Sequence, residues 1–62
     1  MNVFVVLMGE DCEGAYVQAV FASEKDAIKY LDEKYPRWKK TTPTDRRSGC
    51  TSAFVEEWEV NE

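Results

Sequence analysis

Few residues in this chain of 62 have side chains suited to catalysis. There is no histidine, the side chain that most often transfers protons in enzymes. Cys12 lies among acidic residues, which disfavour a reactive thiolate, and Cys50 has no candidate general base near it in the sequence. We therefore expect no catalytic residues and no enzymatic activity, and we interpret both cysteines as ordinary thiols.

The acidic residues near the first glycines do not form a recognisable metal or phosphate site. Glu10, Asp11 and Glu13 match no calcium-loop spacing, and the segment 9–14 lacks the form of a phosphate-binding loop. Two cysteines without a histidine are too few for a zinc site. The sequence therefore predicts no metal and no cofactor, and it favours a solvated turn at 9–14.

A basic segment is the second candidate for chemistry. The chain has a net charge of −4, yet residues 36–52 contain five basic residues and one acidic residue. Positive charge beside an aromatic ring is typical of sequence-tolerant binding to single-stranded nucleic acid. The candidate contacts are Arg37, Trp38, Lys39, Lys40, Arg46 and Arg47. The acidic remainder would repel nucleic acid, so we favour the alternative of a solvated loop with Trp38 packed against the end of a helix.

That helix is predicted over Ser23–Tyr35. Ser23 is a suitable N-cap, Asp26 follows three residues later, and Pro36 disfavours continuation beyond Tyr35. Helical spacing brings four residues onto one apolar face, namely Ala27, Ile28, Leu31 and Tyr35.

Strands are predicted on both sides of the helix. The run 2–8 is apolar at both alternating sets, which is typical of a central strand, and a hairpin loop at 9–14 leads to a second strand at 15–21. The last strand is predicted at 53–60. The segment 38–42 is either a further strand or a loop, and 43–49 is rich in turn-forming residues. We expect one α+β domain over 1–62, with a three- or four-stranded antiparallel sheet and one helix on one face (ββαβ or ββαββ).

One helix can cover only one face of such a sheet. From strand alternation we expect Val17, Ala19 and Phe21 to face the helix, together with Phe54, Trp58 and Val60. An uncovered apolar patch usually marks an interaction site. The predicted interaction face consists of Tyr16, Gln18 and Val20, with Phe4 and Val6 as one of two equal choices for the first strand. The partner would be another protein or a second copy; alternatively, residues 36–51 fold back over this face.

The motifs VFVVL, EGAYVQAVFASEKDAIKYL and FVEEWEV together resemble small proteins encoded by bacteriophages and prophages. The resemblance covers nearly the whole chain except residues 37–51. It implies the strand–turn–strand–helix–strand order and a phage or prophage setting, and it implies no particular functional residues. The function expected is therefore a protein–protein contact that modulates a host enzyme or a defence system, or a structural role in virion assembly.

The cytoplasm of a bacterial host is the expected location. The first residues lack a basic region, and the apolar run 3–8 is too short for a signal peptide or a membrane span. In that compartment Cys12 and Cys50 are most simply free thiols, although a disulfide between them is an alternative.

Overall fold

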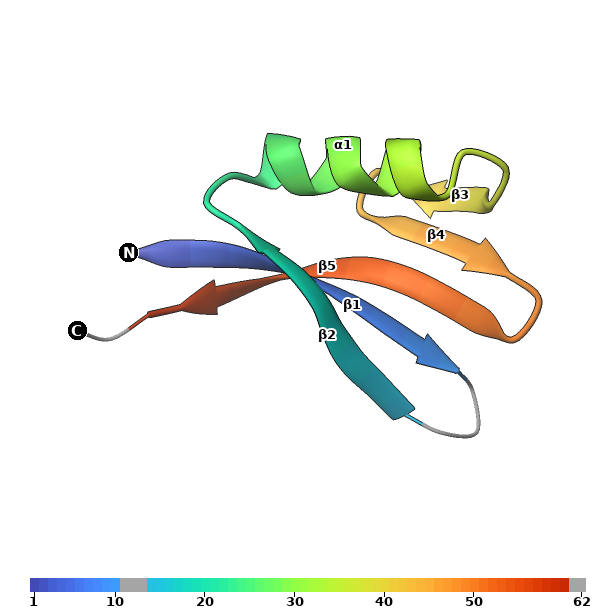
Figure 1. Cartoon of the computed structure of the whole chain (residues 1–62), viewed down its shortest axis with the longest axis horizontal. Coiled ribbons are helices and arrows are strands. Elements are labelled where there is room, and N and C mark those ends of the chain that lie inside the picture. Colours follow the sequence, from blue (N-terminus) through green and yellow to red (C-terminus); the bar gives the residue numbers. More distant parts are fainter. Residues whose placement is uncertain (11–13, 61–62) are drawn as a thin grey trace.

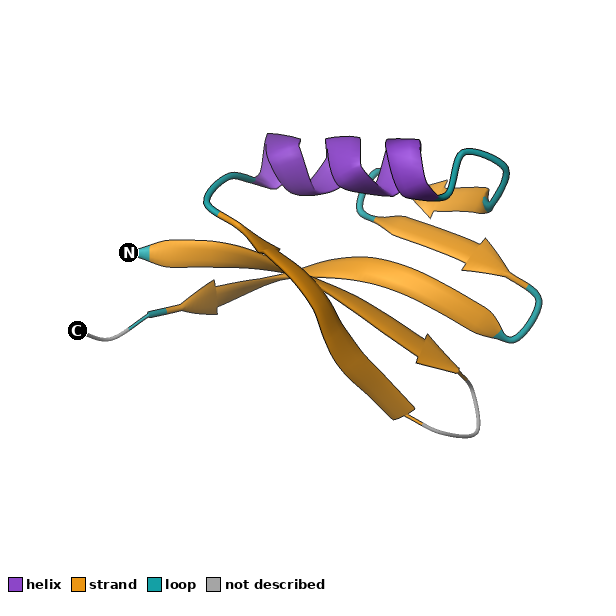
Figure 2. Ribbon diagram, in the orientation of Figure 1, coloured by secondary structure: helices purple, strands orange, loops and turns teal. Residues whose placement is uncertain are grey.

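The computed structural model describes residues 1–10 and 14–60. Within them the chain forms one helix and one antiparallel five-stranded sheet (Figures 1 and 2). The elements are β1 (Asn2–Glu10), β2 (Gly14–Phe21), α1 (Glu24–Lys34), β3 (Lys39–Thr42), β4 (Asp45–Ser48) and β5 (Thr51–Glu59). The α+β class is therefore as predicted, but the sheet has more strands than the three or four expected.

The sheet order is β2-β1-β5-β4-β3, and β1 lies inside it, between β2 and β5. Val5 and Val6 point to opposite sides of the sheet, and both are fully buried. The prediction of a central first strand, made from two apolar alternating sets, is thus confirmed.

The additional strand is β4, in the segment 43–49, whose turn-forming residues predicted a turn. Two tight connections make this possible, because Thr42 pairs with Asp45 and Ser48 pairs with Thr51. Gly49 opens the second connection with a φ of 61°, a conformation that glycine adopts without steric cost. The segment 38–42 contains a strand, β3, but it pairs with β4 and not with β5.

The helix begins and ends where its signals predict. The Ser23 side chain accepts a hydrogen bond from the Asp26 backbone N–H at 3.2 Å, so Ser23 is the N-cap. At the other end the Tyr35 N–H donates to the Leu31 carbonyl at 2.8 Å, and Pro36 follows. Helix α1 contacts β1, β2 and β5.

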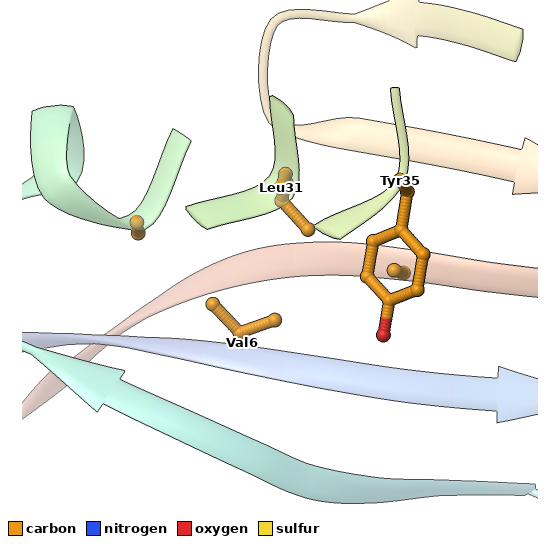
Figure 3. Close-up of a cluster of buried hydrophobic side chains, with 5 residues drawn as sticks. Val6, Leu31 and Tyr35 are labelled. Atoms are coloured by element: carbon orange, nitrogen blue, oxygen red, sulfur yellow. The ribbon is translucent and has the colours of Figure 1, made fainter. Parts of the chain in front are cut away.

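The two sides of the sheet differ in which residues pack with the helix in the hydrophobic core. Val6 and Ala53 are fully buried in one cluster with Ala27, Leu31 and Tyr35 (Figure 3). We call this the Val6 side; it also carries Phe4, Met8 and Val55, which pack against the cluster. Ala27 and Ala53 are small, and their complete burial means that the helix approaches the strands closely here.

A bulge in β2 changes which residues share a side. The β1–β2 pairing runs from Val6↔Ala19 to Leu7↔Val17, so Gln18 is an extra residue on β2. Before the bulge Tyr16 is opposite Met8, and after it Ala19 and Phe21 are opposite Val6 and Phe4. The bulge therefore keeps these three residues on the Val6 side, and it leaves Val17 and Val20 on the other.

Candidate functional site

The candidate functional site is an apolar patch on the side of the sheet opposite Val6. Val17 and Phe54 pair with Leu7, Val20 pairs with Val5, and Trp58 pairs with Val3. Residues directly opposite each other on antiparallel strands point to the same side. These seven residues form what we call the Val5 patch: Val3, Val5, Leu7, Val17, Val20, Phe54 and Trp58.

The Val5 patch has a buried centre and an exposed apolar margin. Val5 is fully buried and Leu7 is 8 % exposed, whereas Val17, Val20 and Trp58 are 48 %, 55 % and 44 % exposed. Cross-strand neighbours flank these two central residues, and neither of them belongs to the helix cluster. The margin remains in contact with water.

Polar side chains lie within and beside the Val5 patch. Glu56 is opposite Val5 and accepts a hydrogen bond from the indole N–H of Trp58 at 2.9 Å. This bond satisfies the one polar group of Trp58 and holds the ring in place on the patch. On β4, Asp45 is opposite Phe54 and Arg47 is opposite Ser52. One acidic and one basic side chain therefore border the patch on the β4 side.

The structure divides the predicted interaction face between both sides of the sheet. Val20 lies in the Val5 patch and is exposed, as predicted. Val6 is fully buried in the helix cluster, and Phe4 packs against it, so both assignments were wrong. Tyr16 and Gln18 are also on the Val6 side, where their hydroxyl and amide groups contact Met8 and Tyr35.

The cause of that error is the bulge together with the parity of β5. Regular alternation would separate Tyr16 from Ala19, but the extra residue Gln18 brings them to the same side. On β5 the helix cluster takes Ala53 and Val55, so the prediction that Phe54 and Trp58 face the helix was wrong. Val17, predicted to face the helix, belongs to the Val5 patch instead.

Gln18 is fixed by a hydrogen bond that crosses from β2 to the end of the helix. The Tyr35 hydroxyl donates to Gln18 Oε1 at 2.6 Å. Burial raises the pKa of Tyr35 above its ordinary value of 10.0. Tyr35 therefore stays a neutral donor at physiological pH.

The basic segment does not form one continuous cationic surface. Arg46 is only 2 % exposed and donates to the carbonyl oxygens of Thr42, Pro43 and Asp45 at 2.9–3.2 Å. It also forms an ion pair with Asp32 at 2.5 Å. The assignment of Arg46 as a nucleic-acid contact was therefore wrong, because its guanidinium is used inside the protein.

Trp38 is also used internally. Its ring stacks on Tyr35 with the centroids 4.3 Å apart and an interplanar angle of 33°, and it packs against the helix cluster. This is the packing that the alternative interpretation of the segment predicted. The basic residues that remain exposed are Arg37, Lys39, Lys40 and Arg47.

Other candidate chemistry is limited in the part of the chain that the structure describes. Cys50 is an exposed free thiol, and Cys12 lies outside the described residues, as do Asp11 and Glu13 of the predicted turn. Residues 1–10 and 14–60 contain no group of three or more side chains placed to bind a metal ion. Among these residues, no helix has the length and apolar character that crossing a membrane requires.

Comparisons with known proteins provide no relative for this chain. No family model matches the sequence, and neither the curated proteins nor the solved structures give a match.

Proposed function

We propose that this is a small non-enzymatic protein that acts by binding another protein through the Val5 patch. In this proposal the helix covers the Val6 side of the sheet and leaves the opposite side for the partner. The partner contributes an apolar surface of its own to meet the valines and Trp58, and it must also accommodate the Glu56 carboxylate, which lies opposite Val5.

The observation that carries the proposal is the exposure of three large apolar side chains around a buried centre. Val17, Val20 and Trp58 are each between 44 % and 55 % exposed on one side of the sheet. Completing the burial of a valine contributes up to about 1.5 kcal/mol, and a tryptophan more, so covering this patch is favourable. Tryptophan is also among the residues that most often dominate binding energy.

The resemblance to phage and prophage proteins supports a setting for the proposal. In a bacterial cytoplasm the partner would be a host enzyme or a defence protein whose action this chain modulates. A role in virion assembly would use the same surface, with another virion protein as the partner. The location of the binding surface is common to both versions.

The test is a comparison of three purified, tagged proteins as capture reagents in host lysate: wild type, Trp58→Lys and Lys29→Glu. Lys29 is exposed on the helix, away from the Val5 patch, so its variant is a matched control for a change of charge. We expect a specific partner to be retained by wild type and Lys29→Glu and lost by Trp58→Lys. Equal retention of the partner by all three proteins would contradict the proposal, because the partner would then bind outside the Val5 patch.

A second candidate function is binding of single-stranded nucleic acid by the exposed basic residues. Its support is the pairing of Lys39 with Arg47 on neighbouring strands, which concentrates positive charge at the β3–β4 hairpin. The stacking of Trp38 on Tyr35 weakens it, because that ring face is no longer available to a base. A fluorescence titration with single-stranded DNA at low and moderate salt tests this idea; binding that is insensitive to salt, or unchanged by Lys39→Glu with Lys40→Glu, contradicts it.

A further inference from the structure

Strand β2 forms one edge of the sheet and is unlike the other edges in its charge. It is first in the order β2-β1-β5-β4-β3, so one side of its backbone has no neighbouring strand. From Gly14 to Phe21 it contains no charged residue and no proline. Such a strand is a template for pairing with another extended segment.

The remaining free edges carry the charges that usually prevent strand pairing. The opposite edge, β3, contains Lys39 and Lys40. On β5 the pairing with β4 ends at Phe54, and the strand beyond it contains Glu56, Glu57 and Glu59. Among the described strands, β2 is therefore the edge that lacks this protection.

The half of β2 before the bulge is exposed at every residue. Residues 14–17 are all exposed, with Tyr16 at 60 % and Val17 at 48 %. In Figure 1 β2 diverges from the helix toward this end, so its first residues are drawn well away from α1. Gln18 turns its side chain inward to Tyr35, so the bulge places no charged or bulky group across this half of the edge.

We propose that two copies of this chain associate by antiparallel pairing of their β2 strands around Tyr16. The pairing segment must be extended, uncharged and free along its backbone, and β2 itself meets all three conditions. Two copies that each carry a net charge of −4 would then meet at a charge-free strand, with no like charges opposite each other. This proposal does not depend on the proposed function of the Val5 patch.

The register follows from the sides on which the residues lie. In antiparallel pairing, two directly opposed residues point to the same side of the sheet. When a two-fold axis perpendicular to the sheet relates the two β2 strands, this condition requires that one residue be paired with its own copy at the axis. An axis at Tyr16 pairs Tyr16 with its own copy and Ala15 with Val17, and both of the latter point to the side of the Val5 patch. The two Val5 patches would then become parts of one wider surface.

The experiment is sedimentation velocity over a wide concentration range, with the Tyr16→Lys and Tyr16→Glu variants measured separately and as an equimolar mixture. We expect wild type to approach twice the chain mass of 7.2 kDa as concentration rises. Each variant alone should associate at least about tenfold more weakly, because like charges would be opposed on the axis. The mixture should recover association, because lysine is then opposite glutamate.

Two controls decide between this edge and the Val5 patch. Tyr16→Phe loses only the 3.4 Å hydrogen bond to Met8 Sδ and should associate like wild type. Trp58→Lys alters the Val5 patch and leaves the β2 edge intact, so it should associate like wild type as well. A monomeric wild type at the highest concentration would overturn the proposal, and so would association lost in Trp58→Lys but kept in Tyr16→Lys.

Discussion

Arg46 and Asp32 form an ion pair whose two members lie in very different surroundings. Arg46 Nη2 is 2.5 Å from Asp32 Oδ1, and the side chains are 2 % and 56 % exposed. The arginine is buried over the turn between β3 and β4, while the aspartate on α1 is half in water. The pair therefore connects the helix to the β3–β4 hairpin and neutralises a charge that could not remain buried alone.

Removing the arginine should destabilise the fold. In Arg46→Ala the carbonyl oxygens of Thr42, Pro43 and Asp45 lose their donor, and we expect the free energy of unfolding to fall by about 2 kcal/mol. Urea denaturation followed by circular dichroism measures the change. Arg37→Ala, at an exposed position, is the control and should stay within about 0.5 kcal/mol of wild type. Equal stability of the two variants would contradict the structural role of Arg46.

The same pair predicts a dependence of stability on acid pH. The hydrogen bond from Arg46 is the main cause that holds the pKa of Asp32 below its ordinary value of 3.8, helped by the positive charges of Arg46 and Lys40 and opposed by desolvation. A carboxyl whose pKa is lowered by folding stabilises the protein above its unfolded pKa, and this contribution is lost as the pH falls through the folded pKa. Unfolding midpoints should therefore decrease below about pH 4, and Asp32→Asn should flatten that part of the profile. An unchanged acid slope in Asp32→Asn would contradict this assignment.

The core around Leu31 should be the most sensitive part of the fold. Leu31 is fully buried and packs with Val6 and Tyr35 (Figure 3), so Leu31→Ala should cost about 3 kcal/mol. A domain of this size has little stability to lose, and we expect Leu31→Ala to be largely unfolded in thermal denaturation. Val17→Ala removes a half-exposed side chain from the Val5 patch and should leave the transition nearly unchanged.

Tyr35 links the helix end to the β2 bulge, and its hydroxyl can be tested alone. Tyr35→Phe removes the donor to Gln18 Oε1 and should cost about 1 kcal/mol in urea denaturation. Because burial raises the pKa of Tyr35 above 10.0, its contribution is complete below pH 10 and is lost as the pH rises through the folded pKa. In alkaline difference spectra the ionisation of Tyr35 should lie above pH 10, and this step should be missing in Tyr35→Phe.

The elements with strong local signals could be predicted from the sequence. Ser23 and Pro36 determine the ends of α1 because capping and the missing proline N–H act within one turn. The doubly apolar run from Val3 to Met8 predicted the interior position of β1. The thirteen residues 36–48 were harder, because β4 is polar and its strand conformation depends on pairing with β5.

An exposed apolar patch on the sheet could be predicted from the sequence, but most of its residues could not. The sequence indicates that apolar side chains remain after one helix has been packed, and Val20 was assigned correctly to the exposed set. The bulge at Gln18 could not be predicted, because nothing in AYVQAVF marks an extra residue. On β5, Ala53 could have indicated which side faces the helix, because a small residue allows the helix to approach closely. Val55 lies on the same side of β5 as Ala53 and packs against the helix cluster, whereas Phe54 lies on the other side.

The most direct test of the account is site-specific photocrosslinking in a bacterial host, with the crosslinking amino acid placed at Val17, at Trp58 or at Lys29. The Val17 and Trp58 positions lie on the Val5 patch, and Lys29 is an exposed position on α1. We predict that Val17 and Trp58 both give a crosslink to the same partner, in a product heavier than two copies of the chain and distinct from any crosslinked pair of β2 strands, and that Lys29 gives none. Crosslinks from Lys29 to that same partner, or none from either patch position, would contradict the proposal that the Val5 patch is the binding surface.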